Sequence, residues 1–149
     1  MDSAEADAAI RRLPRRLRCS PLVPGGGLQA HEGSAGHRGH TIGKHVNKTH
    51  AELALRFQDD PNLKWSSSFT DRQVAAAAIA HALDNNHGAV RNWLAQSWPT
   101  YRFVVDVGAD IGRSMARNGT IVRTSKVHVT LRRDNTMLGY YIKTAFPTP

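Results

Sequence analysis

Residues 126–133 read KVHVTLRR, and polar and apolar side chains alternate along this stretch. A period of two is typical of a β-strand that has one buried and one polar face. The apolar face comprises Val127, Val129 and Leu131, and the polar face comprises Lys126, His128, Thr130 and Arg132. The stretch therefore predicts one strand of a sheet whose other face can carry chemistry.

Two more stretches with a period of two accompany it. The shared faces are Tyr140, Ile142, Thr144 and Phe146 in residues 139–146, and Tyr101, Phe103, Val105 and Val107 in residues 101–107. Asp134, Asn135 and Gly139 are turn residues between the last two stretches, so we expect these to pair as a hairpin. The C-terminal third of the chain is therefore expected to form an antiparallel sheet.

The middle of the chain carries helix signals instead. Thr49–Glu52 has the spacing of a capping box and predicts a helix that Pro61 ends. A second capping box, Thr70–Gln73, opens the alanine-rich stretch Val74–Leu83, which has high helix propensity. Spacings of three and four predict two more helical faces, formed by Ile42 and Val46 and by Val90, Trp93 and Leu94. The order of these elements along the chain, helices before strands, predicts an α+β fold, with N-terminal helices packed on a C-terminal antiparallel β-sheet.

The charge and the cysteine count narrow the class of protein. The chain has 149 residues, a formal net charge of +8 and one cysteine, Cys19. A basic field attracts polyanions such as nucleic acid. A lone cysteine excludes an intramolecular disulfide, which suits a reducing compartment. The longest apolar run, Val74–Ala80, is far shorter than the about 20 residues that a bilayer span needs.

The N-terminal segment differs in composition from the rest. Residues 1–30 are rich in arginine, proline and glycine, and are interpreted as a basic tail or linker. The start is acidic and no apolar run follows it, so it does not look like a secretion signal. We expect a carrier to deliver the protein if it leaves its cell. Residues 31–149 form the expected domain and keep a net charge of +6, from 15 Lys and Arg against 9 Asp and Glu.

Histidine is the residue type that points to chemistry. Five histidines fall between positions 31 and 50, but no His-Glu-x-x-His, cysteine pair or acidic cluster accompanies them, which argues against a metal site. Acid–base chemistry by histidine with a nearby cation would be enough to cleave RNA. Residues that could serve on pattern alone are His45, Arg56, His128 and Thr144. Each also fits a structural role, such as an ion pair between Arg56 and Glu52 four residues earlier.

Five stretches in order resemble the bacterial RNase A-like toxin domain, the C-terminal toxin domain of contact-dependent growth inhibition proteins and related polymorphic toxins. The resemblance spans about residues 25–149. Its motifs are GHTIGKHVNKT at 39–49, ELALRF at 52–57, SFTDR at 68–72, SKVHVTLRRD at 125–134 and GYYIKTAFPTP at 139–149.

The resemblance implies a metal-independent ribonuclease with the fold of pancreatic ribonuclease but without its disulfides, and it requires no cofactor. The family's histidine and its arginine eleven positions later fall on His45 and Arg56, which would be the general base and the phosphate-binding cation. The family's C-terminal Thr-x-Tyr falls on Thr144 and Phe146, so phenylalanine stands where tyrosine is usual. Because Phe146 has no hydroxyl, it would contact substrate only, and we expect His128 or Tyr140 to take over a tyrosine-dependent step. Lys126 and Arg132, on the polar strand face, are expected to bind RNA phosphates.

The resemblance also implies partners and a place of action. The substrate would be RNA, tRNA being one possibility, and a dedicated immunity protein would neutralise the toxin in its producer. The net charge of +6 on residues 31–149 suggests that this partner is acidic. A carrier or secretion system would deliver the domain to the cytoplasm of a competing bacterium or a host cell. The alternatives are a non-catalytic nucleic-acid-binding module, a degenerate toxin in which Phe146 is the lesion, and, last, a metal-dependent nuclease.

Overall fold

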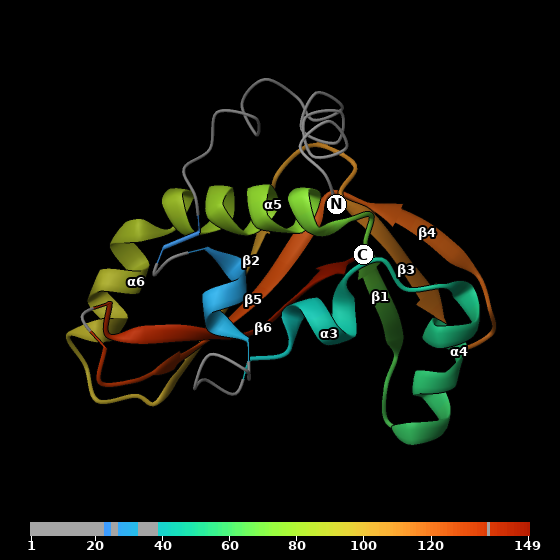
Figure 1. Ribbon diagram of the computed structural model, residues 1–149, viewed down its shortest axis with the longest axis horizontal. Helices are drawn as coiled ribbons and strands as arrows, with labels where there is room; N and C mark the ends of the chain where they lie inside the picture. The colour runs from blue at the N-terminus through green and yellow to red at the C-terminus, as the bar shows by residue number, and fades with distance from the viewer. Residues whose placement is uncertain (1–22, 25–26, 33–38, 137) are drawn as a thin grey trace.

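The structure is a computed structural model that describes residues 23–24, 27–32, 39–136 and 138–149. Helices come first and most strands come later, as the sequence predicts (Figure 1). The helical elements are η1 (Leu28–His31, a 3-10 turn), α3 (Thr41–His45), α4 (His50–Asp59), α5 (Arg72–Asn85) and α6 (His87–Leu94). The strands are β1 (Trp65–Phe69), β2 (Thr100–Asp106), β3 (Gly112–Ala116), β4 (Ile121–Thr124), β5 (Lys126–Arg133) and β6 (Tyr140–Thr148). No helix in the described ranges is both long and apolar enough to span a bilayer.

The first capping box forms as predicted, whereas the second does not, because α5 begins one residue later with a single side-chain cap. At the start of α4 the Thr49 hydroxyl accepts from the Glu52 N–H at 3.1 Å, and the Glu52 carboxylate accepts from the Thr49 N–H at 3.2 Å. At the start of α5 the cap is Asp71, whose carboxylate accepts from the Val74 N–H at 2.9 Å. The Thr70 hydroxyl, which the sequence favours as the cap, instead accepts from Arg123.

Within the part of the chain that the structure describes, the strands form two antiparallel sheets of three strands each, in the orders β1-β3-β4 and β2-β5-β6. The second sheet contains the three predicted strands, and the turn between β5 and β6 closes through the Asp134 N–H and the Gly139 carbonyl at 3.1 Å. Gly139 has φ of 84°, a left-handed conformation that favours glycine. The first sheet was not predicted. Its strand β1 contains three serines, all buried, and the Ser67 and Ser114 hydroxyls hydrogen-bond each other across the β1–β3 pair at 2.8 Å.

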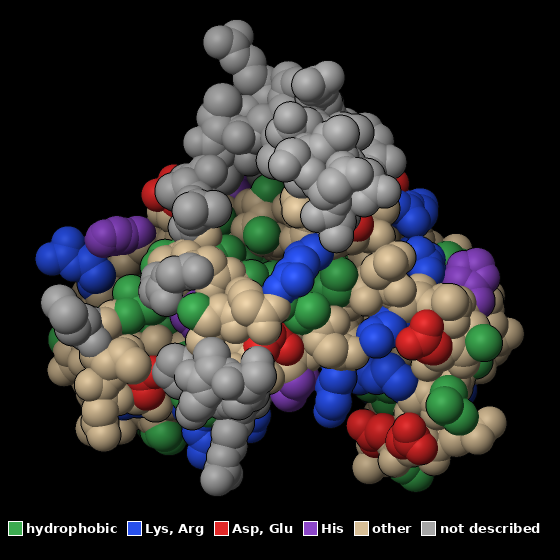
Figure 2. All heavy atoms as spheres, in the orientation of Figure 1, with side chains coloured by type: hydrophobic (Ala, Val, Ile, Leu, Met, Phe, Trp, Pro, Cys, Tyr) green, Lys and Arg blue, Asp and Glu red, His purple; other side chains and the backbone are tan. Residues whose placement is uncertain are grey.

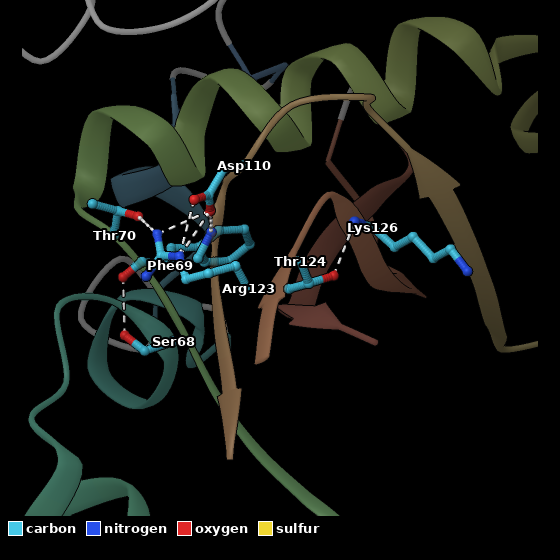
Figure 3. Close-up of polar contacts among 8 residues, drawn as sticks. Ser68, Phe69, Thr70, Asp110, Arg123, Thr124 and Lys126 are labelled. Carbon is cyan, nitrogen blue, oxygen red and sulfur yellow. Dashed lines mark hydrogen bonds and ion pairs between the residues drawn. The ribbon is translucent and has the colours of Figure 1, made fainter. Parts of the chain in front are cut away.

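A polar contact ties the first sheet to the turn before α5. Arg123 of β4 places its guanidinium against the Asp110 carboxylate at 2.9 Å and donates to the Thr70 hydroxyl at 3.2 Å (Figure 3). In the same region Thr124 accepts from the Lys126 N–H at 3.2 Å, where the chain passes from β4 to β5. The Asp110–Arg123 pair is about half exposed, so its main effect is to fix the loop geometry rather than to add much stability.

A β-bulge in β6 changes which side chains face the core. Thr130 lies opposite Thr144 whereas Leu131 lies opposite Ile142, so Lys143 is the additional residue in β6. Ile142 and Ala145 therefore both point into the core, at 1% and 0% exposure, while Thr144 points to the other face. The prediction that Tyr140, Ile142, Thr144 and Phe146 share one face is wrong, because the bulge reverses the alternation after Ile142.

The core lies between α5, α6 and one face of the β2-β5-β6 sheet. In Figure 1, α5 runs across this sheet on the side opposite α3. Val127, Val129 and Leu131 are fully buried, as predicted. The core also takes in Val23 and Leu28, at 2% and 4% exposure, so it reaches back past the expected domain start at residue 31. Residues 1–22 of the expected tail lie outside the described residues.

Candidate active site

A cavity of about 180 Å³ opens between α3, α4, β1 and the bulged part of β6. It holds a histidine pair, an arginine, a threonine hydroxyl and aromatic rings. Its lining comprises His40, His45, Arg56, Leu63, Trp65, Ser67, Thr144 and Phe146. The family-matched residues His45, Arg56, Thr144 and Phe146 are thus brought together from three separate elements.

The short helix α3 that carries His45 is held at both ends. At its start, the Glu32 carboxylate accepts from the Ile42 N–H at 2.9 Å, and the His40 N–H donates to the Lys143 carbonyl at 3.0 Å. After its end, the Asn47 N–H donates to the Phe69 carbonyl of β1 at 3.1 Å. A helix of five residues has little stability of its own, so these tertiary contacts are what position His45.

His45 is buried, with 4% of its surface exposed. Its Nδ1 lies 3.4 Å from the Ser67 carbonyl oxygen and 3.5 Å from Nη1 of Arg56. The Ser67 carbonyl can only accept and the Arg56 guanidinium can only donate, so Nδ1 can hydrogen-bond to only one of them at a time. We assign the hydrogen bond to the nearer Ser67 carbonyl, which places the proton on Nδ1 and leaves the lone pair on Nε2, with Arg56 acting on the ring through its charge. Burial, and next the positive charge of Arg56, lower the His45 pKa to about 3. His45 is therefore neutral at pH 7 and is able to accept a proton.

Arg56 comes from the face of α4 that is turned toward His45, eleven residues further along the chain. It is half-buried, and burial lowers its pKa, but a guanidinium stays charged in proteins. The Glu52 carboxylate that might have paired with Arg56 lies instead against Thr49 and Lys48, at 3.2 Å and 3.6 Å. The charged guanidinium of Arg56 thus lines the cavity beside His45.

The bulge in β6 turns Thr144 and Phe146 toward the cavity. The Thr144 hydroxyl is buried and has no hydrogen-bond partner among the described residues. A buried hydroxyl without a partner costs free energy, and a ligand in the cavity would supply the partner. The Phe146 ring centroid lies 5.2 Å from that of His45 and 4.5 Å from that of His128.

His128 lies on β5 directly opposite Phe146. Its ring stacks on Phe146 with an interplanar angle of 9°, and its Nε2 lies 3.0 Å from the Thr130 hydroxyl. Burial, and next the charge of Arg102, lower the His128 pKa. The structure thus places His128 next to the cavity, in contact with it through Phe146.

The remaining predicted substrate contacts lie elsewhere. Lys126 and Arg132 are exposed on the same sheet face as His128, towards the two ends of β5 and outside the cavity lining. Tyr140 lies on the opposite, core face, and its ring meets the Trp93 ring edge-on at 6.4 Å. The expectation that Tyr140 helps at the site is wrong, because Tyr140 precedes the bulge. It borders a different hollow of about 310 Å³ beside α5 and α6, and burial raises its pKa, which makes it a poorer proton donor.

Four residues of the cavity lining were not predicted from the sequence: His40, Leu63, Trp65 and Ser67. His40 does not fit the family spacing, because the residue eleven positions after it is Ala51 and not an arginine, and Trp65 and Ser67 lie in a strand that was not predicted. The repeated histidine in GHTIGKH was the only sequence signal for His40. Within the described ranges, no three His, Cys, Asp or Glu side chains lie close enough together to hold a metal ion.

Comparisons with known proteins identify the family of the chain. The family model described as the bacterial CdiA-CT RNase A domain matches residues 39–147. A crystal structure of a CdiA-CT/CdiI complex from Y. kristensenii 33638 contains a chain that is 34% identical to this one, with a TM-score of 0.68. The match covers 74% of this chain and all of that one. None of the curated proteins compared with the chain matches it. The family match covers most of the chain and includes the whole cavity, so the chain belongs to the bacterial CdiA-CT RNase A domain family of ribonuclease toxins.

Proposed function

We propose that the chain is a toxin domain that cleaves RNA without a metal ion, by attack of a ribose 2′-OH on the adjacent phosphorus. The observation that carries the proposal is the pairing of a buried neutral histidine, His45, with the Arg56 guanidinium in one cavity. A base for the 2′-OH and a cation for the phosphate are the two groups that this reaction needs most.

In the proposed reaction, Nε2 of His45 takes the proton of the 2′-OH while the 2′-oxygen forms a bond to phosphorus. The Ser67 carbonyl holds the Nδ1 proton, which keeps Nε2 in the form that can accept. Arg56 donates to the non-bridging oxygens, where negative charge grows in the transition state. The bond from phosphorus to the 5′-oxygen then breaks, and a 2′,3′-cyclic phosphate remains.

The other cavity residues position the substrate in this proposal. The unpartnered Thr144 hydroxyl donates to or accepts from a nucleobase or a phosphate, and Phe146 offers a ring on which a base can stack. Lys126 and Arg132 bind phosphates of the flanking nucleotides along the exposed face of β5.

A partner and a place of action complete the proposal. The relative from Y. kristensenii was crystallised as a complex with CdiI. By analogy, an acidic immunity protein binds this chain, covers the cavity and is absent from the target cell, in whose cytoplasm a delivered toxin acts. Lys and Arg side chains gather near α4 in Figure 2, among some acidic ones. The affinity of such a complex should fall as salt is raised, and salt-independent affinity would contradict the electrostatic part of the proposal.

The test is an RNA cleavage assay with the purified chain in excess EDTA. Cleavage should persist in EDTA, leave 2′,3′-cyclic phosphate ends and be lost in His45→Ala. His87→Ala is the matched control, because His87 is an exposed histidine on α6. Cleavage that EDTA abolishes would contradict the metal-free mechanism, and full activity in His45→Ala would remove His45 as the base.

One observation favours a second candidate, a degenerate toxin that binds RNA without cutting it. Phe146 lacks the hydroxyl that the family commonly has at this position. If the unmodified chain binds RNA but does not cleave it, Phe146→Tyr should restore cleavage to a degenerate toxin. A pure binding module would remain inactive with the same substitution.

A further inference from the structure

We propose that His40 is a second catalytic residue, the general acid that protonates the 5′-oxygen as it leaves phosphorus. This proposal rests on the proposed ribonuclease activity and adds to it the source of a proton that the absent tyrosine hydroxyl cannot supply. The motif GHTIGKH contains two histidines, and the family match assigns a role only to the second, His45.

The geometry of the cavity supports the role. Among the described residues that line it, His40 and His45 are the two histidines. Their ring centroids are 6.1 Å apart, too far for a direct hydrogen bond and near enough for both rings to reach different oxygens of one phosphate. His40 caps the start of α3 and His45 ends it, so one short helix fixes both positions.

The step balances with these two residues. The 2′-oxygen forms its bond to phosphorus and gives its proton to His45. The bond between phosphorus and the 5′-oxygen breaks, and the electron pair on that oxygen takes the proton from the ring N–H of the His40 imidazolium. The reaction ends with His45 protonated and His40 neutral, so a proton exchange with water returns both to their starting forms.

The charges around His40 make it ready to release a proton. Burial lowers the His40 pKa most, and the nearby cations Lys44, Lys143 and Arg56 lower it further, while Glu32 raises it. An incoming phosphate brings negative charge that offsets these cations and favours the protonated ring. In this proposal the bound phosphate favours the protonated His40 ring, and the neighbouring cations favour release of that proton as the phosphate charge is redistributed.

His128 is the competing source of the proton. Its ring face is covered by Phe146, and its Nε2 is engaged with the Thr130 hydroxyl at 3.0 Å. These contacts leave His128 less access than His40 to an oxygen inside the cavity, whose lining includes His40. The experiment below compares the two histidines directly.

The test changes the leaving group. RNA is first mapped for its cleavage site, and the same RNA is then made with sulfur in place of the 5′-oxygen at that site. A thiolate leaves without a proton, because a thiol has a pKa of about 8.5, whereas an alkoxide needs one. His40→Ala should lower cleavage of normal RNA by about 10²–10⁴-fold. On the sulfur-containing RNA the same variant should recover most of that loss, because the leaving thiolate needs no proton. His45→Ala should be slow on both RNAs, and His50→Ala, an exposed histidine on α4, should behave as the unmodified chain.

The pH profile gives a second readout. For normal RNA, kcat/KM should fall about tenfold per pH unit above the His40 pKa, which lies below 6.5, and this fall should vanish for the sulfur-containing RNA. Equal losses on both RNAs would show that His40 only supports the structure, and would overturn the proposal. So would unchanged cleavage in His40→Ala, or rescue by sulfur in His128→Ala alone. Failure of the unmodified chain to cut either RNA would contradict the ribonuclease function itself, and this proposal with it.

Discussion

The buried histidine at the centre of the cavity should make the protein sensitive to mild acid. The pKa of His45 is about 3 in the folded chain, because of burial and next of Arg56, whereas an exposed histidine in the unfolded chain has a pKa near 6.5. Between these two values the unfolded chain binds a proton that the folded chain does not. The contribution to stability is therefore fully present above pH 6.5 and is lost as pH falls toward the folded value.

The magnitude follows from the pKa difference. At about pH 4.5 the medium is two units below the unfolded pKa and still above the folded one, so the loss is about 2–3 kcal/mol, at 1.36 kcal/mol per unit. This loss is a large part of the free energy of unfolding of a typical domain, which is roughly 5–15 kcal/mol. The range from pH 6.5 to about 4.5 also lies above the usual pKa of most carboxylates, so histidines dominate it.

The assay is urea unfolding at about pH 7 and about pH 4.5, with His45→Asn as the comparison. Asparagine keeps an N–H that can donate to the Ser67 carbonyl but cannot titrate. His40 and His128, whose pKa values are also lowered, are present in both proteins and cancel in the difference. The unmodified chain should lose about 2–3 kcal/mol more than His45→Asn on acidification. Equal losses in the two proteins would refute the assignment of a strongly lowered pKa to His45.

Three further substitutions test other parts of the site. Arg56→Gln should slow RNA cleavage by about 10²–10³-fold, and should raise the pKa of His45 in an NMR titration without returning it to 6.5, since burial remains. Thr144→Val should leave urea stability unchanged or higher by up to about 1 kcal/mol while cleavage falls about tenfold, and a loss of stability would show that the hydroxyl has a partner. Gly39→Ala should cost about 3 kcal/mol or more in a thermal melt, because its Cβ would clash with the His31 carbonyl oxygen; a stable variant would contradict that contact.

The sequence predicted the elements whose patterns are local. The helices α4, α5 and α6 and the strands β2, β5 and β6 follow from capping residues, alanine content and periods of two or four, which act within a few residues. Strands β1 and β3 lacked such a pattern. The serines of β1 show no local strand pattern, and the segment forms a strand by pairing along its length with β3, where the Ser67 hydroxyl meets that of Ser114.

The resemblance to a family, and not the periodicity, predicted that the candidate site residues belong to one site. His45, Arg56 and Thr144 lie on three elements, and no local pattern states that these elements meet. The prediction failed where a single residue, Lys143, enters the strand as a bulge. That bulge assigns Tyr140 to the core and Thr144 to the cavity, a choice that pairing with β5 makes and that the β6 sequence alone does not reveal.

The bulge also explains how one strand serves both core and site. Ile142 and Ala145 have to fill the core, whereas Thr144 and Phe146 have to face the cavity, and strict alternation from Ile142 would bury Thr144 with it. Inserting Lys143 reverses the alternation at the required position. The carbonyl of Lys143 then accepts from the His40 N–H, so the bulge both directs the β6 side chains and anchors the helix that carries the two histidines. Removing this one residue should therefore affect the whole cavity, because the positions of His40, His45 and Thr144 all depend on it.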